Sequence, residues 1–451
     1  MSDVQGEGRG ERIASDPFVT VRSRYLTSAM IIHFGEYMAM MVTSYLIFHQ
    51  TRSIMATGLI LVCFNAPSLF LARSATILTR RWGAPRVDAG VNTVEAVLAV
   101  VPMVLGLTHH LSPSALLWWV LSYGVCEGLN APNSFLVRQH IAAPGQVPEL
   151  TSAYTRNVAV AAVLAMLGGG AIYLVAGAGW VFAICALTAI PEVLVLRRIS
   201  QLVRKAEADE WSEAPLGETL RVLRSEPALW AACRFAVLCF FVASYTVTLP
   251  AIASSFGTNV EYLSILESGS AIGGLMVSVI VKRLHGRVHW GQVQRRCYFA
   301  AGAGLAAMAG AEFASGTHSR LAALVALLAT VPVGFAVLMN GSIVTSLIQI
   351  GTPRARRTSM FTLLALIPLV VGPLSQLLVG ALADTFSIAT ALGVVAAITI
   401  VVNSVISHRP MSQQFDRLNE LDLPFHVNEL MSHRTAHRGR LHSAHWLGAL
   451  D

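Results

Sequence analysis

A histidine and a carboxylate lie three residues apart in the first long apolar stretch of the chain. His33 and Glu36 stand near the middle of residues 24–49, which are long enough to cross a bilayer as a helix. A spacing of three places both side chains on one helix face. A carboxylate at the centre of a membrane helix costs roughly 2.5 to 3.5 kcal/mol, so it is rare without a partner or a function. The pair therefore predicts proton binding inside a membrane, with a plain polar packing contact as the alternative for His33.

Further ionisable residues stand inside other apolar stretches. Glu127 lies as centrally as Glu36, and we expect both carboxyl groups to face a cavity, where a dry site lets them take and release protons near neutral pH. Arg234 and Glu267 lie closer to the ends of their stretches, so each could instead reach the membrane surface. The candidates for a substrate cavity are Arg234, Glu267, Tyr37 and Met41. The last two could contribute an adaptable apolar surface.

The composition argues against a soluble protein. Of 451 residues, 54% are hydrophobic and 13% are charged, which is typical of a protein with many membrane helices. The net charge of +7 comes from basic residues spread among short loops, so membrane topology explains it better than nucleic acid does. The sequence has no Gly-x4-Gly-Lys-Ser/Thr loop and no Cys-x2-Cys pair. We therefore expect no ATP hydrolysis, no bound metal or other cofactor, and no enzymatic activity.

Twelve apolar stretches have the length of a membrane helix. They cover residues 25–48, 55–78, 87–108, 115–138, 152–175, 179–197, 229–251, 262–283, 296–315, 320–347, 358–382 and 387–407. If both termini are cytoplasmic, nearly all Lys and Arg residues fall in cytoplasmic segments or at the adjoining helix ends, and the external loops hold only Arg52 and Arg320. This asymmetry follows the positive-inside rule and predicts twelve helices with both termini inside.

The longest break between these stretches divides them six and six, which indicates an internal duplication. The predicted organisation is a cytoplasmic N-terminal segment (1–24), a six-helix bundle (25–197), a cytoplasmic linker (198–228), a second six-helix bundle (229–407) and a cytoplasmic tail (408–451). In the tail, His433 and His437 have a helical spacing that can hold a metal. No cysteine or tight carboxylate cluster completes a site there, so we favour a solvated, disordered tail.

Several short motifs stand at characteristic places along the chain. They are Gly35-Glu36, residues 50–59, Pro132, Gly168-Gly169-Gly170, residues 223–227, Gly372-Pro373 and residues 380–384. With these motifs the chain resembles the major facilitator superfamily, and within it the bacterial drug and siderophore exporters. The resemblance covers nearly all of residues 20–407 and implies an all-α membrane fold of twelve helices, alternating access and a central site. It also implies a peripheral third helix, so we expect Glu95 to make a structural hydrogen bond.

The loop after the second span departs from the superfamily pattern, in which a glycine is followed by an acid, a base and a second glycine. Aligned on Arg81 and Gly83, this chain has Arg80 at the position of the acid. The equivalent loop of the second half has Arg283 at that position and Lys282 before it. The resemblance implies that the acid helps to latch the two halves on the cytoplasmic side. We therefore expect a weaker latch in this protein.

These observations predict a secondary transporter of the plasma membrane that exports a lipophilic or amphipathic small molecule, such as a drug, siderophore or secondary metabolite, in exchange for protons. We expect a monomer whose partners are the small molecule, protons and the lipid bilayer, and which binds no nucleic acid. Uncoupled movement of a lipid-like or peptide-like metabolite is the alternative within transport, and the altered loop slightly favours it. A membrane sensor or scaffold that has lost transport is the other alternative.

Overall fold

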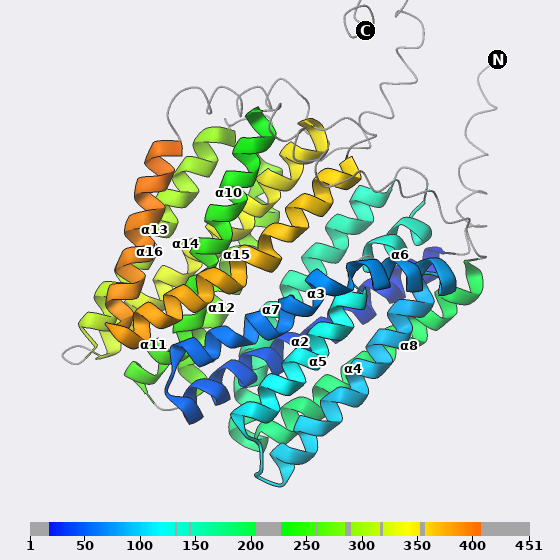
Figure 1. Ribbon diagram of the computed structural model, residues 1–451, viewed down its shortest axis with the longest axis horizontal. Coiled ribbons are helices and arrows are strands. Elements are labelled where there is room, and N and C mark those ends of the chain that lie inside the picture. The colour runs from blue at the N-terminus through cyan, green and yellow to red at the C-terminus, as the bar shows by residue number, and fades with distance from the viewer. Residues whose placement is uncertain are drawn as a thin grey trace, which may run out of the picture.

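The structure is a computed structural model, and it describes residues 18–130, 133–143, 146–203, 227–257, 260–284, 290–315, 319–351 and 357–406. In these ranges the chain forms helices joined by short connections (Figure 1). The helices of the first half are α2 (Val19–Thr51), α3 (Ile54–Trp82), α4 (Ala84–Leu107), α5 (Pro113–Asn130), α6 (Asn133–Ile141), α7 (Val147–Ala176) and α8 (Ala178–Leu202). Those of the second half are α10 (Pro227–Ala243), the 3₁₀ segment η1 (Ser244–Thr248), α11 (Leu249–Phe256), α12 (Val260–Leu284), α13 (Trp290–Phe313), α14 (Ser319–Gly351), α15 (Arg357–Thr385) and α16 (Ile388–Ile406).

Each predicted span coincides with helical residues in the described ranges. The fourth span, 115–138, is divided between α5 and α6, and the seventh, 229–251, runs through α10 and η1 into α11. Of the helices in the described ranges, nine are long and apolar enough to cross a bilayer by length and composition. The all-helical membrane fold is confirmed, whereas the count of twelve crossings stays a prediction.

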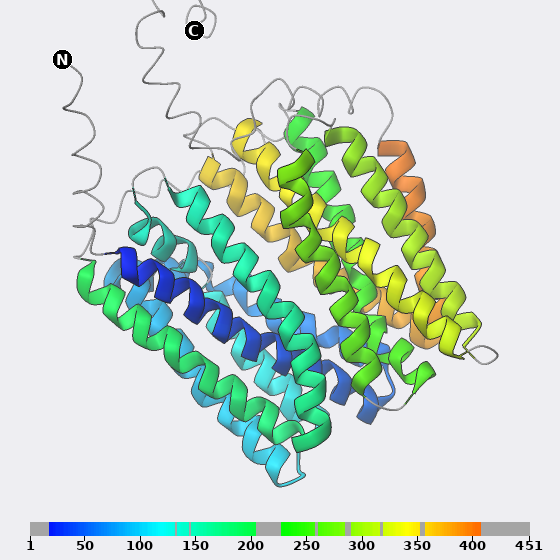
Figure 2. The same ribbon diagram turned by 180° about the vertical axis from the view of Figure 1, so that it is seen from behind.

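The helices form two bundles that lie side by side (Figures 1 and 2). In the N-terminal bundle, which comprises α2 to α8, α2 packs against α7 and α8, α3 against α5, and α4 against α8. In the C-terminal bundle, which comprises α10 to α16, α13 packs against α14 and α16, and α12 packs against α14. The bundles meet where α3 contacts α15 and α7 contacts α12. A limited set of helices therefore joins the two bundles, and one buried apolar cluster runs through both.

Hydrogen bonds join the bundles at the end of the molecule where α2 turns into α3, here called the α2–α3 end. The turn forms because Arg52 adopts a left-handed conformation with φ of 56°. Asp384, near the end of α15, accepts a hydrogen bond from the Ser53 hydroxyl at 2.7 Å and from the backbone N–H groups of Ile54 and Met55 at 2.8 and 3.0 Å. A helix N-terminus carries partial positive charge, so a carboxylate is a favourable partner there. Asp384 therefore ties the two bundles together at this end.

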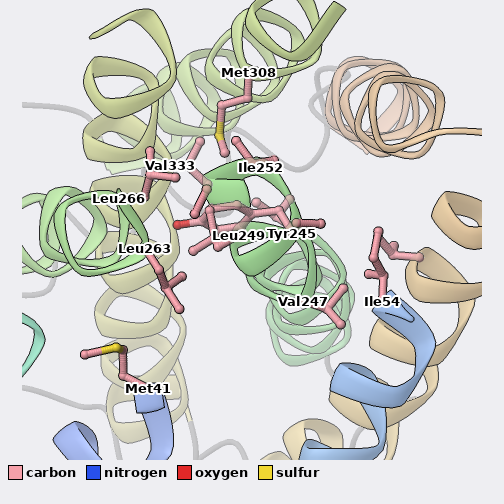
Figure 3. Packing of buried hydrophobic residues seen from close by; sticks show 14 of the residues in the cluster. Met41, Ile54, Tyr245, Val247, Leu249, Ile252, Leu263, Leu266, Met308 and Val333 are labelled. Atoms are coloured by element: carbon pink, nitrogen blue, oxygen red, sulfur yellow. The ribbon is translucent and has the colours of Figure 1, made fainter. Parts of the chain in front are cut away.

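Apolar side chains from four helices of the C-terminal bundle pack against one another. Leu249 and Ile252 from α11 lie among Leu266 of α12, Met308 of α13 and Val333 of α14 (Figure 3). All of these side chains are buried in one hydrophobic cluster. Because lipid is as apolar as these side chains, close van der Waals packing holds such helices together in a membrane. In the described residues, the interior of this bundle thus provides packing and few charged groups.

Candidate functional site

Three carboxyl groups from three helices meet inside the N-terminal bundle. Glu36 of α2, Glu95 of α4 and Glu127 of α5 each offer one carboxylate oxygen, and these oxygens all lie within 4.8 Å of one another. We call this cluster the carboxylate triad. The side chain of Glu36 is 15% exposed, whereas Glu95 is only 4% exposed. Solvent can therefore reach the triad at Glu36, whereas Glu95 is shielded from solvent.

The periodicity of α4 explains how Glu95 comes to face inward. Asp88, Asn92 and Glu95 follow one another at spacings of four and three residues, and all three are buried. Residues at these spacings share one face of a helix. The face of α4 that packs toward the other helices of its bundle is therefore a polar stripe, with Glu95 near the middle of the helix.

Two glycines bring α5 close to α3 and so position Glu127. A Cβ atom on Gly124 would clash with the carbonyl oxygen of Phe64, and one on Gly128 would lie 2.9 Å from Cα of Ser68. Small residues four apart allow two membrane helices to approach this closely. With that face held against α3, the neighbouring face of α5 carries Glu127 into the triad.

Three ionised carboxylates in this site would repel one another strongly. Two unit charges 4.8 Å apart repel by about 3.5 kcal/mol at an effective dielectric constant of about 20, and the triad contains three such pairs. Taking each carboxylate out of water costs several kcal/mol more. The site is therefore stable only when protons, a cation or both reduce its negative charge.

His33 connects the triad to a second set of polar groups. Its Nδ1 lies 2.6 Å from Oε2 of Glu36, and its Nε2 lies 2.7 Å from the hydroxyl of Tyr154 on α7. The predicted shared helix face of His33 and Glu36 is confirmed by this contact. Because both ring nitrogens have partners, the imidazole is fixed in place. It gives Glu36 a direct partner for a proton.

The second set of polar groups lies farther from the α2–α3 end, and we call it the polar layer. Asn130 donates a hydrogen bond to Oδ1 of Asp88 at 2.9 Å. The guanidinium of Arg138 lies 4.2 Å from the ring centroid of Tyr154, and its Nε and Nη1 are buried without a hydrogen bond to any residue the structure describes. Glu192 of α8 is 5% exposed. Titratable groups therefore extend from the triad through His33 into this layer.

The four predicted substrate-cavity residues lie outside the triad. Tyr37 is half-buried, and its ring centroid lies 6.0 Å from that of His33. Met41 is 2% exposed and belongs to the hydrophobic core. Glu267 is half-buried on α12 in the other bundle, and Arg234 is exposed on α10, with its guanidinium over a tryptophan ring. Of the four, only Tyr37 approaches the candidate site, and the cavity assignment stays a prediction.

The residues of the altered loop lie at the ends of two helices. Arg80 and Arg81 are exposed in the last turn of α3. Gly83 follows with φ of 83°, a conformation that glycine adopts without a steric penalty. Lys282 and Arg283 belong to the last turn of α12, and their side chains lie outside the described part of the structure. The expected weakening of the latch is therefore still a prediction.

Glu95 is the residue of the triad that the sequence analysis assigned wrongly. The prediction was a structural hydrogen bond, but neither carboxylate oxygen of Glu95 has a hydrogen-bond partner among the residues described. Its oxygen instead approaches those of Glu36 and Glu127. The spacing of Glu95 from Asp88 and Asn92 was the available signal, because it predicts a polar helix face that must meet other polar groups.

Membrane-length helices that enclose buried ionisable groups are typical of polytopic membrane transporters. The chain belongs to the Major Facilitator Superfamily, whose family model matches residues 25–367. No curated protein is similar enough in sequence to serve as a relative. The protein is therefore a membrane transporter of this superfamily, and its own cargo has to be argued from its site.

Solved structures of several transporters share the fold. A bacterial homologue of the iron transporter ferroportin, in an inward-facing state, is 16% identical with a TM-score of 0.66, and the match covers 86% of this chain and 99% of that one. The nucleoside transporter NupG is 14% identical with a TM-score of 0.62, over 86% and 98% of the two chains. A bacterial homologue of the human lysosomal transporter Spinster is 14% identical with a TM-score of 0.55, over 91% and 98%. At these identities the similarity shows the fold alone.

Proposed function

We propose that this transporter exports a lipophilic or amphipathic small molecule in exchange for protons, and that Glu36 couples the two movements. The observation that carries the proposal is the contact between Glu36 and His33 at the reachable side of the carboxylate triad. A coupling carboxylate must be buried enough for its charge to matter, yet reachable by water and cargo. Glu36 meets both conditions, because it belongs to a buried cluster and its side chain is 15% exposed.

The two-bundle fold supports alternating access to this residue. Asp384 holds the bundles together at the α2–α3 end, which the charge pattern predicts to be external. Release of this contact and closure at the opposite end would expose Glu36 to the other side of the membrane. A proton and the cargo then compete for the same carboxyl group, so the movement of one across the membrane is linked to the movement of the other.

The test is transport by the purified full-length protein in liposomes. Ethidium, a lipophilic cation, serves as the probe, and an imposed pH gradient drives its accumulation. We expect Glu36→Gln to abolish accumulation, because an amide cannot carry a proton across the membrane. Fluorescence-detected gel filtration checks that the variant is folded. If Glu36→Gln accumulates ethidium at the wild-type rate, Glu36 is not the coupling residue.

Counterflow separates coupling from binding. Exchange of labelled for unlabelled probe across the membrane needs no net proton movement, so Glu36→Gln should retain more counterflow than uphill accumulation. Equal loss of both activities would indicate that Glu36 binds cargo rather than protons. Wild-type accumulation that does not respond to the pH gradient would favour the uncoupled alternative.

Orientation and location form part of the same proposal. We place both termini in the cytoplasm, because the basic residues crowd alternate loops, and we further propose a monomer in the plasma membrane. Thr258 and Thr352 lie in loops predicted to face opposite sides, and both are outside the described residues. A membrane-impermeant thiol reagent added to whole cells should label a cysteine placed at Thr258 but not one placed at Thr352. The reverse pattern would invert the topology.

A further inference from the structure

The carboxyl group of Glu95 is buried without a partner. Glu95 is 4% exposed, and neither of its carboxylate oxygens has a hydrogen bond to any residue in the described ranges. Buried polar groups in proteins are normally hydrogen-bonded, so such an exception needs an explanation. Here the unpartnered oxygen points at two other carboxylates, those of Glu36 and Glu127. This arrangement indicates a missing ligand that interacts with all three oxygens.

The charged groups around the triad do not balance it. His33 contacts Glu36 and supplies at most one positive charge. Arg138 lies beyond it, over Tyr154 in the polar layer, and that layer also contains the buried acids Asp88 and Glu192. When all three carboxyl groups are ionised, a ligand with two positive charges would match the negative charge that His33 leaves uncompensated.

We propose that Glu36, Glu95 and Glu127 bind a divalent metal cation of the class that prefers oxygen ligands. The inference goes beyond the proposed function and does not depend on it. Oxygens bound to such a cation at about 2.0 to 2.6 Å lie about 3 to 5 Å from one another. The triad oxygens lie within 4.8 Å of one another, which is inside the upper limit of this range.

The neighbours of the triad fit a metal site. The hydroxyl of Tyr123 is buried and lies against the Glu36 carboxylate, where it offers a fourth oxygen. An all-oxygen ligand set favours Mg²⁺, Mn²⁺ or Ca²⁺ over metals that prefer sulfur or imidazole. His33 has both nitrogens occupied, so it orients the Glu36 carboxylate and leaves the metal to the oxygens.

Mn²⁺ binding to the purified full-length protein tests the proposal. The electron paramagnetic resonance signal of free Mn²⁺ measures how much is bound, in detergent and without cargo or a gradient. We expect wild type to bind Mn²⁺, and Glu95→Gln and Glu127→Gln each to bind it at least about tenfold more weakly, because one charged ligand is lost. Glu192→Gln is the matched control, since it removes a buried carboxyl group from the same bundle but outside the triad. It should bind Mn²⁺ as wild type does.

Each other outcome overturns the proposal. No Mn²⁺ binding by folded wild type at millimolar concentration would refute a site of this class. Equal binding by wild type and Glu95→Gln would locate the ion elsewhere, for example among the six tail histidines, His408, His426, His433, His437, His442 and His445. Glu95-dependent binding of ethidium in place of Mn²⁺ would make the triad a site for organic cations instead.

The proposal of a metal site and the proposal of proton-coupled export can be refuted independently. Export is measured with a chelator present and no added metal, whereas Mn²⁺ binding is measured without a gradient. Loss of Mn²⁺ binding in Glu95→Gln with export retained would support the metal site and leave the proposed function intact. Wild type that exports but binds no Mn²⁺ would overturn the metal site alone.

Discussion

In the N-terminal bundle, α4 and α5 are joined by a hydrogen bond from Asn130 to the Asp88 carboxylate, whereas in the C-terminal bundle α13 and α14 are joined by one from Gln294 to Asn340. Asp88 and Gln294 stand at the same distance from the starts of α4 and α13, which are the third spans of the two predicted repeats. A pair of an amide and a carboxyl group on one side thus corresponds to a pair of amides on the other. The same helical arrangement accommodates both.

The contrast extends to the carboxylate triad. The position that matches Glu95, at the same distance from its helix start, is Ala301, which is fully buried. In α14, the buried Val333 belongs to the apolar packing of Figure 3. Ionisable groups are costly inside a membrane bundle and persist where they have a function. Among the described residues, the buried charged side chains therefore gather in the N-terminal bundle, and the C-terminal bundle mainly supplies packing.

The largest expected effect is a difference in transport between a carboxyl substitution in the N-terminal bundle and the same substitution in the C-terminal bundle. Glu127→Gln should reduce proton-driven ethidium accumulation in liposomes to the level of protein-free liposomes, because it removes a charge from the triad beside Glu36. Glu267→Gln, the same change in α12, should retain the dependence on the pH gradient and alter only the concentration of half-maximal transport. If Glu267→Gln loses gradient dependence while Glu127→Gln keeps it, the comparison between the bundles is wrong.

A smaller effect is expected from the matched polar contacts. Asn340 accepts from Gln294 at 2.6 Å and donates to the Phe235 carbonyl at 3.1 Å, so Asn340→Leu should destabilise the protein by about 1 to 3 kcal/mol. Asn130→Leu should cost a similar amount, since it removes a hydrogen bond from the buried Asp88 carboxylate. Thermal unfolding in detergent measures both losses.

Transport rates should distinguish Asn130→Leu from Asn340→Leu, although the two variants are expected to lose similar amounts of stability. At a temperature where both are folded, we expect proton-driven transport to change in Asn130→Leu and to stay at the wild-type level in Asn340→Leu. An unchanged transport rate in Asn130→Leu would show that the polar layer is structural in both bundles.

The smallest effect concerns the contact between the bundles. Asp384→Ala removes a cap worth about 0.5 to 2 kcal/mol, so it should shift the ratio of the two access states by roughly tenfold toward opening at the α2–α3 end. Spin-label distances across that end measure the shift. Arg80→Asp, at the opposite end, restores the acid of the superfamily pattern and should change the distances across its own end. Unchanged distances in Asp384→Ala would mean that other contacts hold the bundles together there.

The sequence by itself determined the features that depend on residues close together in the chain. Apolar length predicted the membrane helices, since a backbone in lipid must satisfy its hydrogen bonds within each helix. Helical periodicity placed His33 beside Glu36, and the contact of 2.6 Å agrees with it. The prediction that Glu127 lies near the middle of a membrane helix likewise came from the apolar residues on either side of it in the sequence.

Only the tertiary structure decided which helices share an interior. It brought Glu95 to Glu36 and Glu127, although the family resemblance had implied a peripheral third helix. It also brought Asp384 to Ile54, 330 residues away. The physical reason is that periodicity fixes the face on which a side chain lies, whereas close contacts such as that of Gly124 with Phe64 fix which helix that face meets. The charge of the site therefore arises from packing, because no single helix carries more than one member of the triad.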